Sequence, residues 1–246
     1  MRACVAAALC MVFWSTAAWA YRPFDSTDAS VAAPGEFELE LGPAGYLGTA
    51  DQRFLTAPGA IFNLGLFPQW EAVLQGRQLV LIDGPANAHR LELVDTGVFL
   101  KGVLRRGSLQ QREGPSVAAE FGPLLPTVNG DPGVGATIGA IVSQRWSAAT
   151  VHVNGVISYT RAHNPDLFGG IILEGPYSWE MRPVAEVFVE REFDTLFAVS
   201  GLVGAIWRVS DGLSLDTAVR AASVEDQGLL EVRLGFTWAT SLWEQE

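Results

Sequence analysis

The chain has 246 residues, and its 27 acidic side chains against 16 basic ones give a net charge of −11. Nucleic acid, which attracts basic surfaces, is therefore not expected as a partner. Both cysteines, Cys4 and Cys10, lie at the start of the chain, so the rest offers no disulfide framework, thiolate nucleophile or cysteine metal site.

Residues 1–20 have the pattern of a secretory signal peptide. Arg2 supplies a positive charge, residues 6–14 form an apolar run, and Ala18-Trp19-Ala20 offers the small residues of a cleavage site. No segment reaches the ~20 continuous apolar residues that a membrane-spanning helix needs. Removing this leader takes away one basic residue and leaves 15 basic against 27 acidic, or −12. The sequence predicts an exported chain.

From residue 35 onward, segments of roughly ten residues alternate between apolar and polar side chains, and turn-forming clusters separate them. A period of two gives a strand one apolar and one polar face, and its repetition along a whole chain is typical of a β-barrel. In chain order the predicted strands are 35–46, 58–67, 69–83, 91–106, 113–124, 133–145, 148–160, 167–175, 179–191, 195–208, 213–222 and 228–239.

These 12 segments predict an all-β fold, a single antiparallel up-and-down transmembrane barrel over residues 35–239. A periplasmic lead is expected at 21–34 and a short tail at 240–246. Tight turns such as 67–70 follow even-numbered strands and are assigned to the periplasmic side. Longer connections such as 48–57 and 222–228 follow odd-numbered strands and are assigned to the outside.

The segment from Leu230 to Trp238 shows the face pattern clearly, because leucine, valine, phenylalanine and tryptophan alternate there with Glu231, Arg233, glycine and threonine. In a soluble sheet the polar face would favour lysine, yet only Lys101 occurs. Arginine suits confined, partly desolvated ion pairs, so the polar faces are assigned to a lumen. We expect Arg77, Arg220 and Arg233 there to pair with Glu71, Asp216 and Glu231. The faces of strand 195–208 stay undecided.

Two further groups of residues follow from this assignment. The candidate lumen-lining charges are Glu38, Glu40, Glu71, Arg77, Asp95, Lys101, Glu120, His152, Glu186, Glu190, Asp216, Arg220, Glu231 and Arg233. Aromatic rings with one polar atom favour the interface between lipid tails and headgroups. The candidate interface aromatics, all beside predicted periplasmic turns or at the end of the last strand, are Trp70, Trp146, Trp179, Trp207 and Trp238.

Several blocks resemble the proteobacterial outer-membrane family named after the MetA pathway of phenol degradation. They are 22–29 (RPFDSTDA), 35–42 (GEFELELG), 182–186 (RPVAE), 215–220 (LDTAVR) and 231–238. The resemblance implies an outer-membrane barrel that acts as a transporter, with small hydrophobic or aromatic compounds as solutes. It also implies contact with outer-membrane lipid and with the outer-membrane assembly machinery. It implies no catalytic or ligand residues, and no cofactor or metal is expected.

Three functions remain open from the sequence. A channel would prefer cations, because acidic residues outnumber basic ones on the inward faces. A structural barrel would have a lumen closed by paired charges, with residues 21–34 as a tether or a plug. A hydrolase is the least favoured, because the serines lack a Gly-x-Ser-x-Gly motif and His152 shares a strand face with Asn154 and Ser158 without a defined nucleophile. A hydrogen-bonding role in the lumen is the simpler interpretation of His152.

Overall fold

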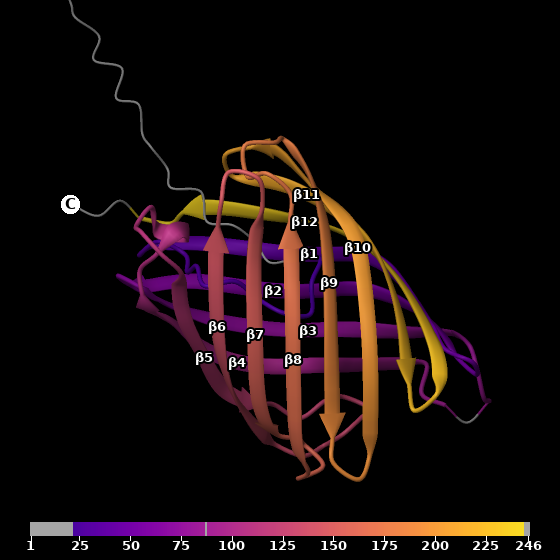
Figure 1. Cartoon of the computed structure of the whole chain (residues 1–246). Coiled ribbons are helices and arrows are strands. Elements are labelled where there is room, and N and C mark those ends of the chain that lie inside the picture. The colour runs from indigo at the N-terminus through magenta and orange to yellow at the C-terminus, as the bar shows by residue number, and fades with distance from the viewer. Residues whose placement is uncertain (1–21, 87, 244–246) are drawn as a thin grey trace, which may run out of the picture.

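A closed antiparallel barrel of 12 strands forms the fold (Figure 1). The computed structural model describes residues 22–86 and 88–243, so the predicted signal peptide lies outside the described residues. The strands are β1 (Glu36–Gly48), β2 (Arg53–Phe67), β3 (Trp70–Asp83), β4 (Leu91–Arg105), β5 (Ser116–Leu124), β6 (Gly135–Arg145), β7 (Thr150–Tyr159), β8 (Pro165–Glu174), β9 (Met181–Glu192), β10 (Leu196–Ser210), β11 (Leu213–Val224) and β12 (Gln227–Ser241).

Every strand pairs with its neighbours in the sequence, and β1 closes the ring by pairing with β12. The predicted fold class, including the even strand number, is therefore confirmed. The strands are 9 to 15 residues long, which is sufficient for a tilted strand to cross a bilayer. A short 3₁₀ helix, η1 (Ser108–Gln110), lies between β4 and β5. Within the described ranges, no helix is long and apolar enough to cross a membrane.

The strand faces divide by polarity. Leu104, Ile157 and Val203 point outward and keep 63%, 62% and 65% of their surface exposed. Soluble monomers rarely expose apolar surface on this scale, whereas a barrel in lipid requires it. Polar side chains such as Glu186 and Glu231 point inward and are 1% and 2% exposed. The barrel is thus apolar outside and polar inside.

Strand β10 follows the same rule, although its sequence left the faces undecided. Leu202 and Ile206 are buried inside the barrel, at 2% and 5% exposure, while Val199 and Trp207 are exposed on the outer face at 45% each. Leu202 lies opposite Glu186 of β9 in the strand register, so it belongs to the inward set. Apolar residues on both faces explain why no alternation was visible.

Two connections are shorter than predicted. The segment 48–57 was expected to be a loop, but β2 begins at Arg53 and the connection is limited to 49–52. Pro58, which marked the predicted strand start, lies at a register shift between Thr56 and Gly59. A proline cannot donate to the strand ladder, but a bulge accommodates it without ending the strand. The predicted loop 222–228 is likewise limited to 225–226, since β11 and β12 extend into it.

Candidate functional site

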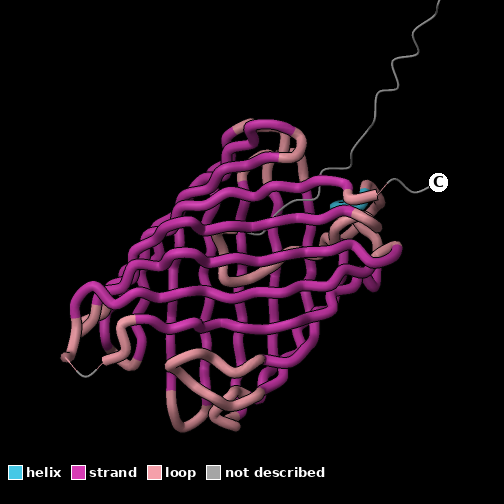
Figure 2. Tube along the Cα trace, turned by 180° about the vertical axis from the view of Figure 1, so that it is seen from behind, coloured by secondary structure: helices cyan, strands magenta, loops and turns pink. Residues whose placement is uncertain are grey.

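Residues 22–34, which are part of the predicted lead, lie inside the ring of strands. We call them the N-terminal segment. In Figure 1 it is the indigo coil within the barrel, and Figure 2 shows the same coil behind the strands from the opposite side. It leads directly into β1, where the Gly35 amide donates to the Gly65 carbonyl of β2 at 2.9 Å.

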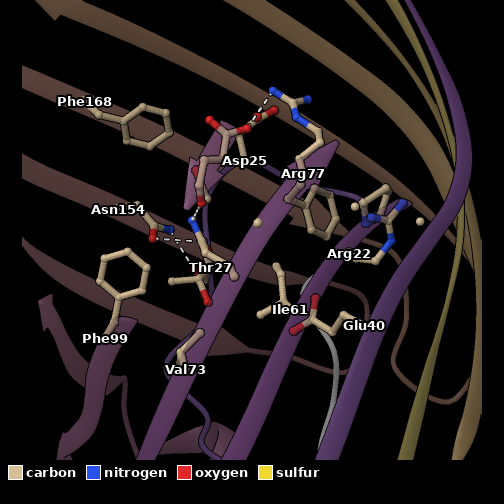
Figure 3. Close-up of a pocket in the computed structure, with 18 of the residues that line it drawn as sticks. Arg22, Asp25, Thr27, Glu40, Ile61, Val73, Arg77, Phe99, Asn154 and Phe168 are labelled. Atoms are coloured by element: carbon tan, nitrogen blue, oxygen red, sulfur yellow. Dashed lines mark hydrogen bonds and ion pairs between the residues drawn. The ribbon is translucent and has the colours of Figure 1, made fainter. Parts of the chain in front are cut away.

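Backbone amides of the N-terminal segment donate to side chains from several strands. On β9, the two carboxylate oxygens of Glu186 accept from the amides of Ser26 at 2.7 Å and Asp25 at 2.9 Å. On β7, Asn154 accepts from the Thr27 amide at 3.1 Å and donates to the Thr27 carbonyl at 2.8 Å, as Figure 3 shows. The segment is therefore held by specific polar contacts across the barrel.

Further contacts come from the remaining sides of the lumen. The Ala29 amide donates to Ser143 Oγ of β6 at 3.0 Å, and the Ala32 amide donates to Glu71 Oε2 of β3 at 2.6 Å. On β12, Arg233 donates to the Pro23 carbonyl at 2.7 Å. Buried polar side chains need hydrogen-bond partners, and here the backbone of the N-terminal segment supplies them to the inward side chains of the strands.

Three predicted lumen arginines converge on one carboxylate. Glu231 accepts from Arg233 at 2.7 Å, Arg77 at 3.0 Å and Arg220 at 3.3 Å. Arg233 also contacts Asp25 of the N-terminal segment at 2.9 Å. A buried acid with three guanidinium partners is fully compensated, so this cluster ties β3, β11 and β12 together across the lumen.

The expected Arg233–Glu231 pair is present, but the other two predicted pairs are wrong. Arg77 contacts Asp95 at 2.8 Å rather than Glu71, and Asp216 contacts Arg22 at 3.3 Å rather than Arg220. Glu71 is six positions from Arg77 on the same strand, about 20 Å away at the rise of an extended chain. The actual partners lie on the adjacent strand β4 and on the N-terminal segment, and strand alternation alone does not reveal them.

A second charge cluster surrounds Lys101, which is 6% exposed. Its Nζ lies 3.4 Å from Glu71 and 3.5 Å from Asp28 of the N-terminal segment. The strand register places Lys101 directly opposite both Glu71 and Glu120. The single lysine of the sequence thus lies among carboxylates, inside the barrel.

His152 forms part of a buried chain of three side chains. Its Nδ1 is 2.7 Å from Ser143 Oγ, and its Nε2 is 3.0 Å from Glu174 Oε1. Ser143 and His152 are 0% and 1% exposed, and the Ser143 oxygen already accepts from the Ala29 amide. Of the predicted neighbours, Asn154 instead contacts the N-terminal segment, so Ser143 and Glu174 are the partners that sequence reasoning missed.

Beside the N-terminal segment, the lumen retains a cavity of about 670 Å³. In Figure 3, Asn154 and Phe168 approach it from one wall and Arg77 and Glu40 from the other, with Asp25 and Thr27 between them. The predicted lumen charges that line it are Glu38, Glu40, Glu71, Arg77, Asp95, Lys101, Glu120, Glu190, Arg220, Glu231 and Arg233. The other three, His152, Glu186 and Asp216, are buried within the barrel and hold the N-terminal segment directly or through one neighbour.

The five candidate interface tryptophans lie toward the end of the barrel that carries the start of β1 and the end of β12. Trp70 begins β3, Trp146 and Trp179 lie in connections, and Trp207 and Trp238 lie near the ends of β10 and β12. Trp146, Trp179, Trp207 and Trp238 are 44% to 55% exposed.

Among the described residues, no three His, Asp or Glu side chains are placed to hold a metal ion.

Comparison with known proteins identifies the fold but no family. No family model and no curated protein matches the chain, so membership of the MetA-pathway family stays a prediction. An outer membrane channel from Pseudomonas putida F1 is similar in structure, with a TM-score of 0.62 and 10% identity over 88% of this chain and 100% of that one.

A KdgM porin is also similar, with a TM-score of 0.53 and 9% identity over 82% of this chain and 98% of that one. The KdgM porin in complex with disordered oligogalacturonate gives 0.54 and 9% over the same shares. At these identities the likeness concerns the barrel fold.

Proposed function

We propose that this protein is an outer-membrane channel for small solutes, exported through its signal peptide and closed at rest by the N-terminal segment. The observation that carries the proposal is the cavity of about 670 Å³, which is lined by charges and lies inside a closed barrel with an apolar outer face. The outer-membrane channels with similar folds support it. In the proposed orientation in the outer membrane, the end of the barrel that carries the tryptophans faces the periplasm, and the opposite end faces the cell exterior.

The cavity lining favours cations and solutes with an apolar part. Acidic residues outnumber basic ones around it, and the rings of Phe99, Phe168 and Phe188 also face it. A polyanion such as the oligogalacturonate in the KdgM complex would meet an excess of carboxylates here. Small aromatic or hydrophobic compounds, as in the predicted family, suit the phenyl rings better.

Bilayer recording tests the proposal. We expect the intact mature protein to conduct weakly and with cation preference, and a variant lacking residues 22–34 to conduct more, because the segment then no longer occupies the lumen. Absence of current from both proteins, or anion preference in the open variant, would contradict the channel.

A closed structural barrel is the second candidate, because hydrogen bonds from β3, β6, β7, β9 and β12 hold the N-terminal segment. A structural barrel of this kind would show no conductance in bilayer recordings of the intact protein. No enzymatic activity is proposed, since Ser143 is buried and its oxygen is occupied by the Ala29 amide.

A further inference from the structure

One wall of the cavity, formed by β8 and β9, combines carboxylates with phenyl rings. The register places Asp166 opposite Glu192 and Phe168 opposite Glu190, all on inward positions. The rings of Phe168 and Phe188 lie 5.1 Å apart with 36° between their planes. Because Asp166, Phe168, Phe188 and Glu190 all line the cavity, a solute there would meet negative charge and aromatic surface together.

Glu192 accepts from the Thr160 hydroxyl and from the Asn164 amide, but Asp166 and Glu190 form no ion pair with a residue that the structure describes. The Asp166 carboxylate is 6% exposed and accepts from the Ser158 hydroxyl and the Leu167 amide, but its Oδ1 has no hydrogen-bond partner among the residues that the structure describes. Glu190 takes part in none of the ion pairs formed within the described ranges, whereas Glu231 has three arginine partners. A buried acceptor without a donor is costly, and its position on a cavity indicates a donor that comes from outside the chain.

The same wall already accommodates one positive group. The Arg220 guanidinium carbon lies 4.7 Å from the centre of the Phe188 ring, in the range of a cation–π contact. Its neighbour Phe168 extends into the lumen from β8, as Figure 3 shows. An incoming cation can therefore use Phe168 in the way that Arg220 uses Phe188.

We propose that this wall, defined by Asp166, Phe168 and Glu190, binds a small organic cation with an apolar part, such as an aromatic ammonium. Its ammonium group lies over the Phe168 ring and donates to the carboxylates of Asp166 and Glu190, and its apolar part extends along the phenyl rings of the wall. The inference rests on the proposed function, since the cation is a solute that enters the lumen. A cation that enters from the end opposite the tryptophans would reach this wall before the N-terminal segment. The reason is that Glu186, which binds the Asp25 amide, lies two positions before Phe188 on β9 and thus farther from that end.

Equilibrium binding to the full mature protein in detergent micelles tests this site, with benzylammonium as the probe in isothermal titration calorimetry. Benzyl alcohol and benzoate keep the ring but lack the positive charge, so we expect each to bind at least about tenfold more weakly. Asp166→Asn and Glu190→Gln each remove a charge with little change of shape and should weaken benzylammonium binding by about tenfold. Phe168→Ala should weaken it about three- to tenfold.

Asp194→Asn is the matched control, because this exposed carboxylate lies in the connection 193–195 near the same end of the barrel. It should leave the affinity unchanged, and circular dichroism checks that every variant keeps its strand content. Equal affinity for benzyl alcohol and benzylammonium would overturn the site, as would unchanged affinity in the Asp166→Asn/Glu190→Gln double variant. Because the titration needs no current, conductance without benzylammonium binding overturns only this site, and binding without conductance overturns only the channel.

Discussion

Replacing Glu186 by glutamine should loosen the N-terminal segment by an amount that the structure allows us to estimate. The Glu186 carboxylate is 1% exposed and accepts from the Ser26 and Asp25 amides at 2.7 and 2.9 Å, one with each oxygen. Glutamine keeps one acceptor and turns the other into an NH₂ group, which faces an amide hydrogen. One charge-assisted hydrogen bond is therefore lost.

A hydrogen bond to a charged group contributes about 1.5–3 kcal/mol, so the equilibrium constant for release of the segment should rise about 10- to 150-fold. Contacts farther along, such as those of Ala29 and Ala32, do not involve Glu186. Only the part of the segment around Asp25 and Ser26 should loosen, while the barrel stays closed.

Hydrogen exchange followed by mass spectrometry measures this release. In Glu186→Gln the amides of Asp25 and Ser26 should exchange faster by that factor, and those of β9 should not change. Glu180→Gln is the matched control, since Glu180 is exposed in the connection before β9. Identical exchange of the segment in Glu186→Gln and in the unaltered protein would refute the estimate, because these two bonds would then not hold the segment.

Three other substitutions test separate parts of the structure. Val203→Arg places a charge on the outer face and should lower the free energy of unfolding from liposomes by about 2–4 kcal/mol, whereas Asp211→Arg in an exposed turn should not; equal values would argue against a lipid-facing β10. Gly65→Ala puts a Cβ 1.9 Å from the Ala33 carbonyl oxygen, so exchange of residues 30–34 should accelerate, and unchanged exchange would contradict the close approach. The unaltered protein should release no fatty acid from phospholipid, because Ser143 is buried; hydrolysis that disappears in His152→Ala would establish the enzyme instead.

The barrel itself could be predicted because its signal is local. Alternation in segments such as 230–238 indicates directly which side chains face outward, and it requires no knowledge of partners elsewhere in the chain. The predicted start of the second strand was wrong, because Pro58 lies at a bulge within β2. The faces of β10 were left undecided, because this strand carries apolar side chains such as Leu202 on its inner face as well.

The contents of the lumen could not be predicted in the same way. Arg22 and Asp216 are 194 positions apart, and Arg233 and Asp25 are 208 apart. The segment 22–34 has no periodicity of its own, so the sequence does not show that its backbone amides satisfy Glu186, Asn154 and Ser143. The position of this segment depends on side chains from strands that follow much later in the sequence.

The N-terminal segment also bears on how the ring stays shut. β1 and β12 are neighbours that no turn of the chain connects, so the seam between them relies on noncovalent contacts. Arg233 of β12 binds Pro23 and Asp25, which precede the first residue of β1 by 13 and 11 positions. The segment therefore bridges the seam between β12 and the start of β1, and any release of the segment from the lumen would also remove these contacts across the seam.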